Sequence, residues 1–268
     1  TTVTYIVTDG AGLTATCSYT VTVNDNQNPT ITCPAAQTVV GNASCQGTLG
    51  NYVGMAVTAD NCGVASVTQS PAAGTLFVGL QIVTLTVTDV NGLTANCTFN
   101  VTVTDVTPPT ITCPAAQAGT VNGSCQFALL NYTGMAVAAD NCGAPTVTQS
   151  PVTGTLVAIG TTVVTLTATD AAGNIATCTF NVVVTDVTPP TATCPANQTL
   201  PVDAACNATL PDYTGMVTAT DNCGVASVTQ SPVVGTALSG HGTVQVVTIT
   251  VTDINGLTNT CTFNVTLQ

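Results

Sequence analysis

The chain has 268 residues, no lysine or arginine, and 12 acidic residues that are all aspartate, so its formal net charge is -12. This charge disfavours binding to nucleic acid and to anionic membrane surfaces, and threonines interrupt every apolar run, which excludes a membrane-spanning helix in this segment. Aromatic residues make up only 4% of the chain and tryptophan is absent, so the core must be built mainly from Val, Ile, Leu and Ala.

The first 25 residues match the end of a later segment of the same chain. The sequence Thr-Ala-Thr-Cys-Ser-Tyr-Thr around Cys17 is similar to Thr-Ala-Asn-Cys-Thr-Phe-Asn around Cys97. We therefore expect residues 1–25 to be the C-terminal strands of a truncated preceding repeat, with Cys17 unpaired in this chain.

A repeat of about 80 residues follows. Its centre is Asp-Asn-Cys-Gly, at residues 60–63, 140–143 and 221–224, with Val-Thr-Gln-Ser-Pro after it and Tyr-x-Gly-Met before it. The pattern predicts repeats at residues 26–105, 106–186 and 187–268, and we expect the signature Tyr and Met side chains in the core.

Strands are predicted from alternation of apolar residues and threonine. Residues 82–88 alternate in this way, residues 89–92 supply a turn, and the next run places Cys97, Phe99 and Val101 on one face. A period of two indicates a half-buried strand, and several short strands without helical periodicity predict an all-β fold. We expect tandem immunoglobulin-like β-sandwich domains of roughly seven strands. Proline-containing linkers at 105–109 and 186–190 favour a rod-like array.

Of the thirteen cysteines, twelve sort into one quartet per repeat, and Cys17 is left over. Four cysteines allow three pairings, and spacing alone does not choose among them. We favour first with second and third with fourth, which close loops worth about 3 and about 4 kcal/mol on the chain-entropy model. The expected pairs are Cys33–Cys45, Cys62–Cys97, Cys113–Cys125, Cys142–Cys178, Cys194–Cys206 and Cys223–Cys261. Zinc is the rival interpretation, but Cys-x-x-Cys is absent and only His241 could add a nitrogen ligand.

Nine of the aspartates occupy three positions per repeat. In an immunoglobulin-like topology the entering linker, the loop around the third cysteine and the last hairpin turn can lie at one tip. Three carboxylates there would suit calcium at an interdomain junction, although aspartates that merely begin turns explain the same pattern. The candidate calcium ligands are Asp25, Asp60 and Asp89; Asp105, Asp140 and Asp170; and Asp186, Asp221 and Asp253.

These motifs carry a family resemblance. Pro-Pro-Thr-Ile-Thr-Cys-Pro at 108–114, the Asp-Asn-Cys-Gly centre and the Thr-Cys-Thr-Phe-Asn-Val close resemble the hyalin repeat (HYR) family. The resemblance implies immunoglobulin-like modules of extracellular adhesion proteins. Long bacterial arrays of this kind look like giant cell-surface adhesins of the Bacteroidota, including those used in gliding motility.

Function is therefore expected to be structural and adhesive. No enzyme is expected, because His241 is the only histidine and the chain contains no lysine, arginine or glutamate. The favoured hypothesis is the disulfide-stapled shaft of an extracellular adhesin or cell-surface filament. The alternative is a spacer or carbohydrate-binding module of a secreted hydrolase. Expected partners are neighbouring repeats, identical chains in a fibre, and a surface polysaccharide or another adhesion target. No cofactor is required, and calcium at the junctions is the one candidate.

Overall fold

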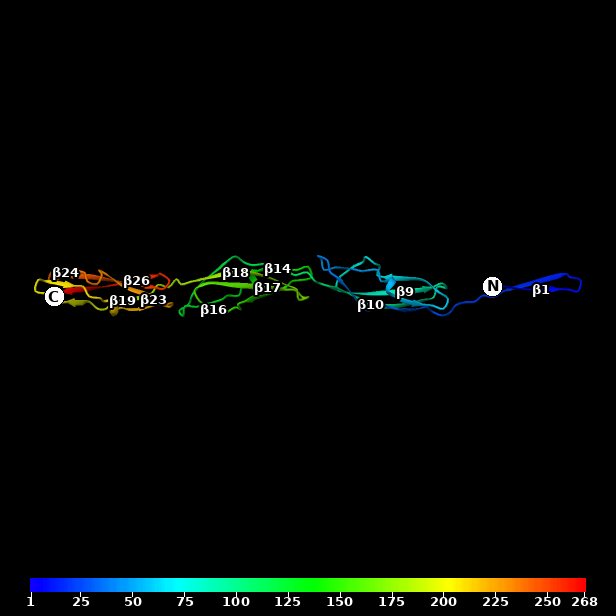
Figure 1. Ribbon diagram of the computed structural model, residues 1–268, viewed down its shortest axis with the longest axis horizontal. Coiled ribbons are helices and arrows are strands. Elements are labelled where there is room, and N and C mark those ends of the chain that lie inside the picture. Colours follow the sequence, from blue (N-terminus) through cyan, green and yellow to red (C-terminus); the bar gives the residue numbers. More distant parts are fainter. The chain divides into compact units, whose positions relative to one another are not determined.

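The computed structural model describes residues 1–268 and is built almost entirely of β-strands, coloured along the chain in Figure 1. The helical segments are three-residue 3-10 turns, and no helix has the length and apolar character needed to cross a membrane. Contacts divide the chain into two compact units, residues 1–107 with 141–143, and residues 108–140 with 144–268.

The first unit begins with a hairpin of β1 (Thr2–Thr8) and β2 (Thr14–Thr20). Asp9 Oδ1 closes the turn by accepting the backbone N–H groups of Ala11 and Leu13, at 2.9 and 2.8 Å. Most of the hairpin is exposed, and Cys17 lies on β2.

Eight strands and one 3-10 turn follow in the first unit. They are β3 (Thr30–Thr32), β4 (Gln37–Val40), β5 (Gly47–Thr48), η1 (Val53–Met55), β6 (Val57–Ala59), β7 (Val64–Ser70), β8 (Leu76–Phe77), β9 (Leu80–Asp89) and β10 (Thr94–Thr104).

The second unit contains the same set of elements twice. The first set is β11 (Thr110–Thr112), β12 (Gln117–Thr120), β13 (Phe127–Ala128), η2 (Thr133–Met135), β14 (Val137–Ala139), β15 (Thr146–Ser150), β16 (Leu156–Val157), β17 (Gly160–Thr169) and β18 (Ile175–Thr185). The second set is β19 (Thr191–Thr193), β20 (Gln198–Leu200), β21 (Asn207–Thr209), η3 (Thr214–Met216), β22 (Thr218–Thr220), β23 (Val225–Ser231), β24 (Ala237–Ser239), β25 (Val244–Asp253) and β26 (Thr258–Leu267).

Each set forms a four-stranded sheet and two short strand pairs. In the middle repeat the sheet order is β12-β18-β17-β15, with β12 parallel to β18, and the short pairs are β11-β14 and β13-β16. The expected immunoglobulin-like, all-β fold is confirmed. Each repeat has eight strands rather than about seven, because a Cys-Pro pair splits the first strand and proline cannot donate a ladder hydrogen bond.

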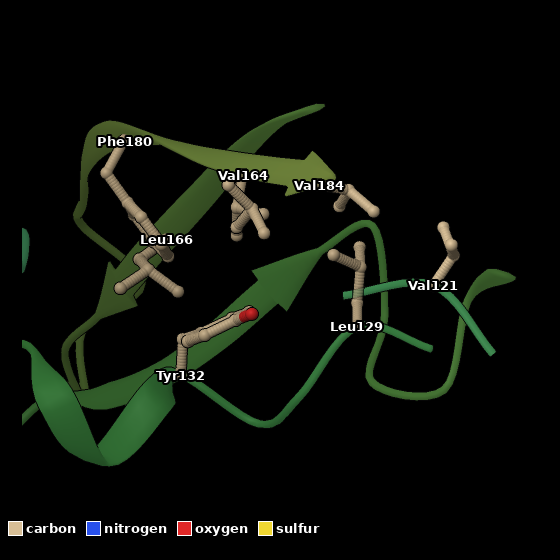
Figure 2. Close-up of a cluster of buried hydrophobic side chains, with 8 residues drawn as sticks. Val121, Leu129, Tyr132, Val164, Leu166, Phe180 and Val184 are labelled. Atoms are coloured by element: carbon tan, nitrogen blue, oxygen red, sulfur yellow. The ribbon is translucent and has the colours of Figure 1, made fainter. Parts of the chain in front are cut away.

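The core of the middle repeat shows how the alternating pattern is used. Leu166 and Val164 on β17 and Phe180 on β18 point toward Leu129 and Tyr132, as Figure 2 shows. The threonines between them lie on the other face of the sheet and are more exposed. Cys178, which occupies the same inward position of its strand as Cys97, packs against this core.

The Tyr-x-Gly-Met signature divides into a buried and an exposed half. Tyr132 is 2% exposed and meets Phe180 edge-on, with ring centroids 5.2 Å apart, whereas Met135 is 47% exposed. The prediction that the signature methionines lie in the core was therefore wrong, because the 3-10 turn carries Met135 to the surface.

The glutamine of Val-Thr-Gln-Ser-Pro has a structural use that sequence analysis did not find. Gln149 Oε1 accepts the Tyr132 N–H at 2.8 Å, and its Nε2 donates to the carbonyls of Leu130 and Pro151 at 2.9 and 3.1 Å. One side chain therefore satisfies three backbone groups and fixes the turn that inserts the tyrosine.

Candidate metal centre at the repeat junction

Strand pairing in the second unit brings one repeat's turn to the start of the next. Since β12 runs parallel to β18 and Thr120 pairs with Thr185, the turn at 121–126 lies where the chain leaves β18. Val121 N–H donates to the Thr185 carbonyl at 3.1 Å, and Asp186 follows immediately. In the next repeat, Val225 at the start of β23 pairs with Asp253 at the end of β25. We call residues 121–126, 186–188, 221–224 and 253–257 the junction.

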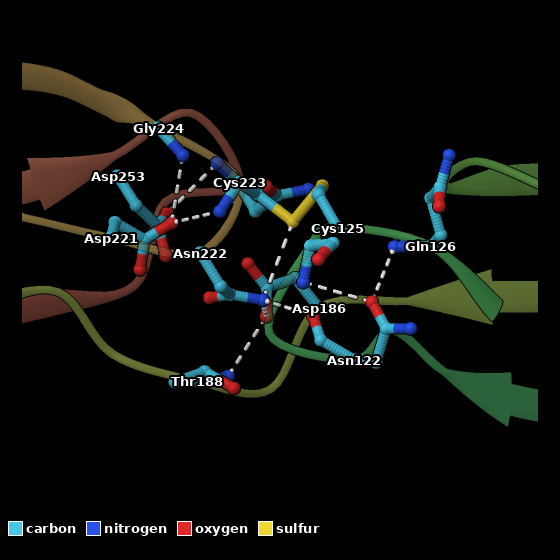
Figure 3. Close-up of a disulfide and its surroundings, with 12 residues drawn as sticks. Asn122, Cys125, Gln126, Asp186, Thr188, Asp221, Asn222, Cys223, Gly224 and Asp253 are labelled. Atoms are coloured by element: carbon cyan, nitrogen blue, oxygen red, sulfur yellow. Dashed lines mark hydrogen bonds between the residues drawn. A yellow bond between two sulfur atoms is a disulfide. The ribbon is translucent and has the colours of Figure 1, made fainter.

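The turn at 121–126 presents a cysteine in an uncommon conformation. Asn122 Oδ1 accepts the N–H groups of Ser124 and Gln126, at 2.9 and 3.1 Å, and Cys125 adopts φ +57°. Cys125 bonds to Cys223 with a Cα–Cα distance of 4.8 Å (Figure 3). The loop's Asn222 Nδ2 adds a hydrogen bond to the Asn122 carbonyl at 3.2 Å. The middle and last repeats are thus joined covalently and by a hydrogen bond.

Every repeat also has a disulfide between its first and fourth cysteines, Cys33–Cys97, Cys113–Cys178 and Cys194–Cys261. Cys45–Cys142 repeats the Cys125–Cys223 pairing and ties residues 141–143 to the first unit. The predicted pairs Cys33–Cys45, Cys62–Cys97, Cys113–Cys125, Cys142–Cys178, Cys194–Cys206 and Cys223–Cys261 are therefore not the pairs that form.

The physical reason for this correction is tertiary. In each first–fourth pair the cysteine after the first strand and the inward cysteine of the last strand are 5.7 Å apart between Cα atoms, well within disulfide reach. Cys125, a second cysteine, and Cys223, a third cysteine, lie in loops of consecutive repeats that meet at the junction. Loop length alone could not reveal this, because folding brings the partner close from 98 residues away.

Three cysteines have no disulfide partner in this chain, namely Cys17, Cys62 and Cys206, and all are exposed. Cys206 lies in the turn of the last repeat that is equivalent to the turn of Cys125, with φ +61°, and Asp203 takes the place of Asn122 there. Cys62 occupies the same loop position as Cys223, and the Asp25 carboxylate beside it raises the pKa of its thiol.

At the junction the structure brings the three aspartates of the last predicted triplet together. Asp186, Asp221 and Asp253 each place a carboxylate oxygen within 4.8 Å of the others. Asp253 is 1% exposed and Asp186 8% exposed, and Asp221 is half-buried. They come from the linker, the third-cysteine loop and the last hairpin turn, as the topology predicts (Figure 3).

One oxygen of each carboxylate is held by backbone N–H groups. Asp253 Oδ1 accepts from Asn255 and Leu257 at 2.8 Å each, Asp221 Oδ2 from Cys223 and Gly224 at 2.7 and 2.9 Å, and Asp186 Oδ1 from Thr188 at 3.0 Å. Gly224 can donate in this way because it adopts φ +116°, which explains the glycine of Asp-Asn-Cys-Gly.

The other oxygen of each carboxylate is buried and has no hydrogen-bond partner. These atoms are Asp186 Oδ2, Asp221 Oδ1 and Asp253 Oδ2. The aspartates therefore accept hydrogen bonds within turns and also each keep one buried oxygen without a partner, so the two sequence interpretations are compatible.

The first unit repeats this arrangement with Asp25, Asp60 and Asp89, which also lie within 4.8 Å of one another. Asp89 is 2% exposed, and Asp25 Oδ2, Asp60 Oδ1 and Asp89 Oδ2 are buried without a hydrogen-bond partner. The backbone N–H of Gln27 holds the pKa of Asp25 below its usual value.

The middle triplet differs at Asp170. The Nδ2 of Asn174 donates to Asp170 Oδ2 at 2.8 Å, and the Asn174 N–H donates to Oδ1 at 2.8 Å. Burial by itself would raise the pKa of Asp170, but these hydrogen bonds have the larger combined effect. The pKa of Asp170 is therefore below its usual value. Asn174 stands where Leu93 and Leu257 stand in the other repeats. Calcium binding by Asp105, Asp140 and Asp170 stays a prediction.

The HYR domain model matches residues 24–103, 104–184 and 185–267. The chain belongs to the HYR domain family. It is 35% identical over 283 aligned residues to hyalin of Strongylocentrotus purpuratus, covering 100% of this chain and 23% of that protein. It is also 35% identical to hyalin of Lytechinus variegatus, covering 85% of this chain and 44% of the relative. The chain thus spans less than half of either relative, and neither supports the expected bacterial setting.

Among solved structures, the titin I-band fragment I67–I69 is 10% identical, with a TM-score of 0.43, and covers 91% of this chain and 100% of that one. Mouse cadherin-23 EC22–24 is 13% identical, with a TM-score of 0.40, and covers 91% and 99%.

Proposed function

We propose that this chain is a structural and adhesive segment of an extracellular protein, in which tandem repeats form the shaft of an adhesin or cell-surface filament. The observation that carries the proposal is the disulfide between consecutive repeats, Cys125–Cys223, which is separate from the disulfide inside each repeat. A shaft must keep neighbouring domains together under load, and a covalent bond beside the linker serves that purpose.

The density of disulfides supports an extracellular location. Five disulfides form in the 268 residues, and such bonds persist in oxidising environments rather than in a reducing cytosol. The absence of lysine and arginine removes every trypsin-type cleavage site, which suits an exposed chain.

The alternative, a carbohydrate-binding module, would need exposed aromatic rings to stack on sugars. Tyr5 and Tyr19 stack in the N-terminal hairpin, with ring centroids 6.1 Å apart, and are exposed. The other tyrosines and phenylalanines are buried or half-buried in the three cores. This distribution favours the shaft over a sugar-binding platform.

A catalytic role is not part of the proposal. His241 is exposed in a turn between Gly240 and Gly242, which have φ +97° and +79°. The buried carboxylates of Asp186 and Asp253 lie at the junction and accept hydrogen bonds from backbone N–H groups. A structural role accounts for all of these groups.

Immunogold electron microscopy of intact producing cells, with an antibody against this chain, tests the proposal. Gold along thin surface filaments or over the cell surface is the expected result. Label confined to soluble secreted protein would overturn the shaft function and favour the spacer-module alternative.

A further inference from the structure

We propose that Asp186, Asp221 and Asp253 bind one divalent cation, Ca²⁺, at the junction between the middle and last repeats, and that Asp25, Asp60 and Asp89 form an equivalent site. The proposal goes beyond the adhesive function and does not depend on it.

Negative charge is concentrated at the junction. Three carboxylates lie together, and Asp253 and Asp186 are more than nine-tenths buried. Buried charges in proteins are paired or coordinate metals, because removal from water is otherwise costly. The chain contains no lysine or arginine, and its one histidine is exposed in a turn of the last repeat. No basic side chain of this chain therefore neutralises the cluster.

Each carboxylate of the cluster has one buried oxygen that lacks a hydrogen-bond partner. Backbone N–H groups hold one oxygen of each carboxylate, while Asp253 Oδ2, Asp221 Oδ1 and Asp186 Oδ2 are buried without a partner. Buried polar atoms are nearly always satisfied, so three at one place require an occupant. The amide oxygen of Asn222, in the same loop, is a fourth buried atom without a partner.

The chemistry of the available ligand atoms indicates the identity of the ion. Carboxylate and amide oxygens without sulfur or nitrogen are the ligands of a hard cation, and Ca²⁺ accepts six to eight of them in flexible geometry. Cys223 cannot serve as a thiolate, because its sulfur is bonded to Cys125. Since the three aspartates come from the linker, a loop and a hairpin turn, one ion would fix the linker against the last repeat.

The middle repeat supplies an internal contrast. There the Asn174 amide already satisfies Asp170 Oδ2, the atom equivalent to the unpartnered Asp253 Oδ2. Leu257 occupies the equivalent position beside Asp253. Introducing that amide with Leu257→Asn should fill the place of the cation.

The test uses the full oxidised chain and native mass spectrometry during titration with Ca²⁺. Asp253→Asn keeps an oxygen for the N–H groups of Asn255 and Leu257 but removes a charge, and we expect it to bind one Ca²⁺ fewer than the unmodified chain. Leu257→Asn should also lose one. The matched control is Asp203→Asn, because asparagine closes the equivalent turns at Asn42 and Asn122 and Asp203 is outside the clusters.

Thermal melting separates binding from a merely structural role. In chelator, Asp253→Asn should melt above the unmodified chain because carboxylate repulsion is relieved, and in excess Ca²⁺ it should melt below. Undiminished Ca²⁺ uptake in Asp253→Asn and Leu257→Asn, an equal loss in Asp203→Asn, or a lower melting temperature of Asp253→Asn in both conditions would each overturn the site. An equal response to Mg²⁺ would overturn the choice of Ca²⁺.

Discussion

Cys125 and Cys223 are 98 residues apart in the sequence, yet their Cα atoms lie 4.8 Å apart and their sulfurs are bonded. On the chain-entropy model a loop of this length is worth about 4.7 kcal/mol, compared with about 4.3 kcal/mol for the Cys113–Cys178 loop. The bond also joins two sandwiches that otherwise share a short linker, so its main consequence is mechanical.

Force extension should show the disulfides directly. When the oxidised chain is pulled from its ends, the residues between Cys33 and Cys97, Cys113 and Cys178, and Cys194 and Cys261 are shielded from the load. Reduction frees these enclosed segments, whose cysteines are separated by 64, 65 and 67 residues in the sequence. Single-molecule force spectroscopy should therefore record roughly 210–240 Å of additional extension per repeat after reduction. Equal extension before and after reduction would contradict the first–fourth pairing.

The exposed thiols should pair between molecules. Cys206 lies in the turn of the last repeat that is equivalent to the turn of Cys125. Cys62 lies in the loop of the first repeat that is equivalent to the loop of Cys223. Mild oxidation of purified chain should produce end-to-end dimers with a Cys206–Cys62 bond, identified by peptide mapping. Cys206→Ser should reduce the dimer yield severalfold. Dimers joined mainly through Cys17 in the unmodified chain would show that turn and loop geometry do not direct pairing.

The middle core should be sensitive to truncation of Leu166, which is fully buried. Leu166→Ala should destabilise that repeat by about 2–5 kcal/mol, because it leaves a cavity beside Tyr132 and Phe180. Native-state hydrogen exchange should show the loss in β17 and β18 and not in β25 and β26. Val163→Ala, at an exposed position of the same strand, should cost less than about 1 kcal/mol.

Gln149 should contribute more to the stability of the middle repeat than its partly exposed position suggests. Gln149→Ala removes the acceptor of the Tyr132 N–H and the donor to two carbonyls, which should cost about 1–3 kcal/mol in urea unfolding of the middle repeat. The matched control is Gln117→Ala, which removes one exposed hydrogen bond to Ala115 and should cost about 0.5 kcal/mol or less. Equal effects of the two substitutions would remove the role assigned to Gln149.

The strands and their inward faces could be predicted from the sequence, because period-two alternation places Phe99 and Val101 in the core without knowledge of the partner strands. Topology also predicted that Asp186, Asp221 and Asp253 lie close together, since the linker, the loop and the hairpin turn that carry them share one tip of the domain. The disulfide pairs did not follow, because the second cysteine of one repeat bonds to the third cysteine of the next, and loop length within a repeat does not reveal that partner. The signal that was missed is that Cys45 and Cys125 lie in Asn-closed turns beside the departing linker.

Asp170 shows a second limit. Its position in the repeat predicts the same role as Asp253, but one nearby side chain changes what its carboxylate can do. Asn174 in place of leucine supplies an amide that reaches Oδ2, and only side-chain geometry reveals that contact.

The most direct test of the covalent array is a disulfide map of the folded, unreduced chain. Free thiols are alkylated first, and the protein is then denatured without reductant and cleaved before aspartate, since tryptic sites are absent. Fragment 221–252, which contains Cys223, should remain attached to fragment 105–139 through Cys125, and fragment 186–202 to 253–268 through Cys194–Cys261. Fragment 221–252 attached instead to 253–268, through Cys223–Cys261, would contradict the inter-repeat bond and the shaft built on it.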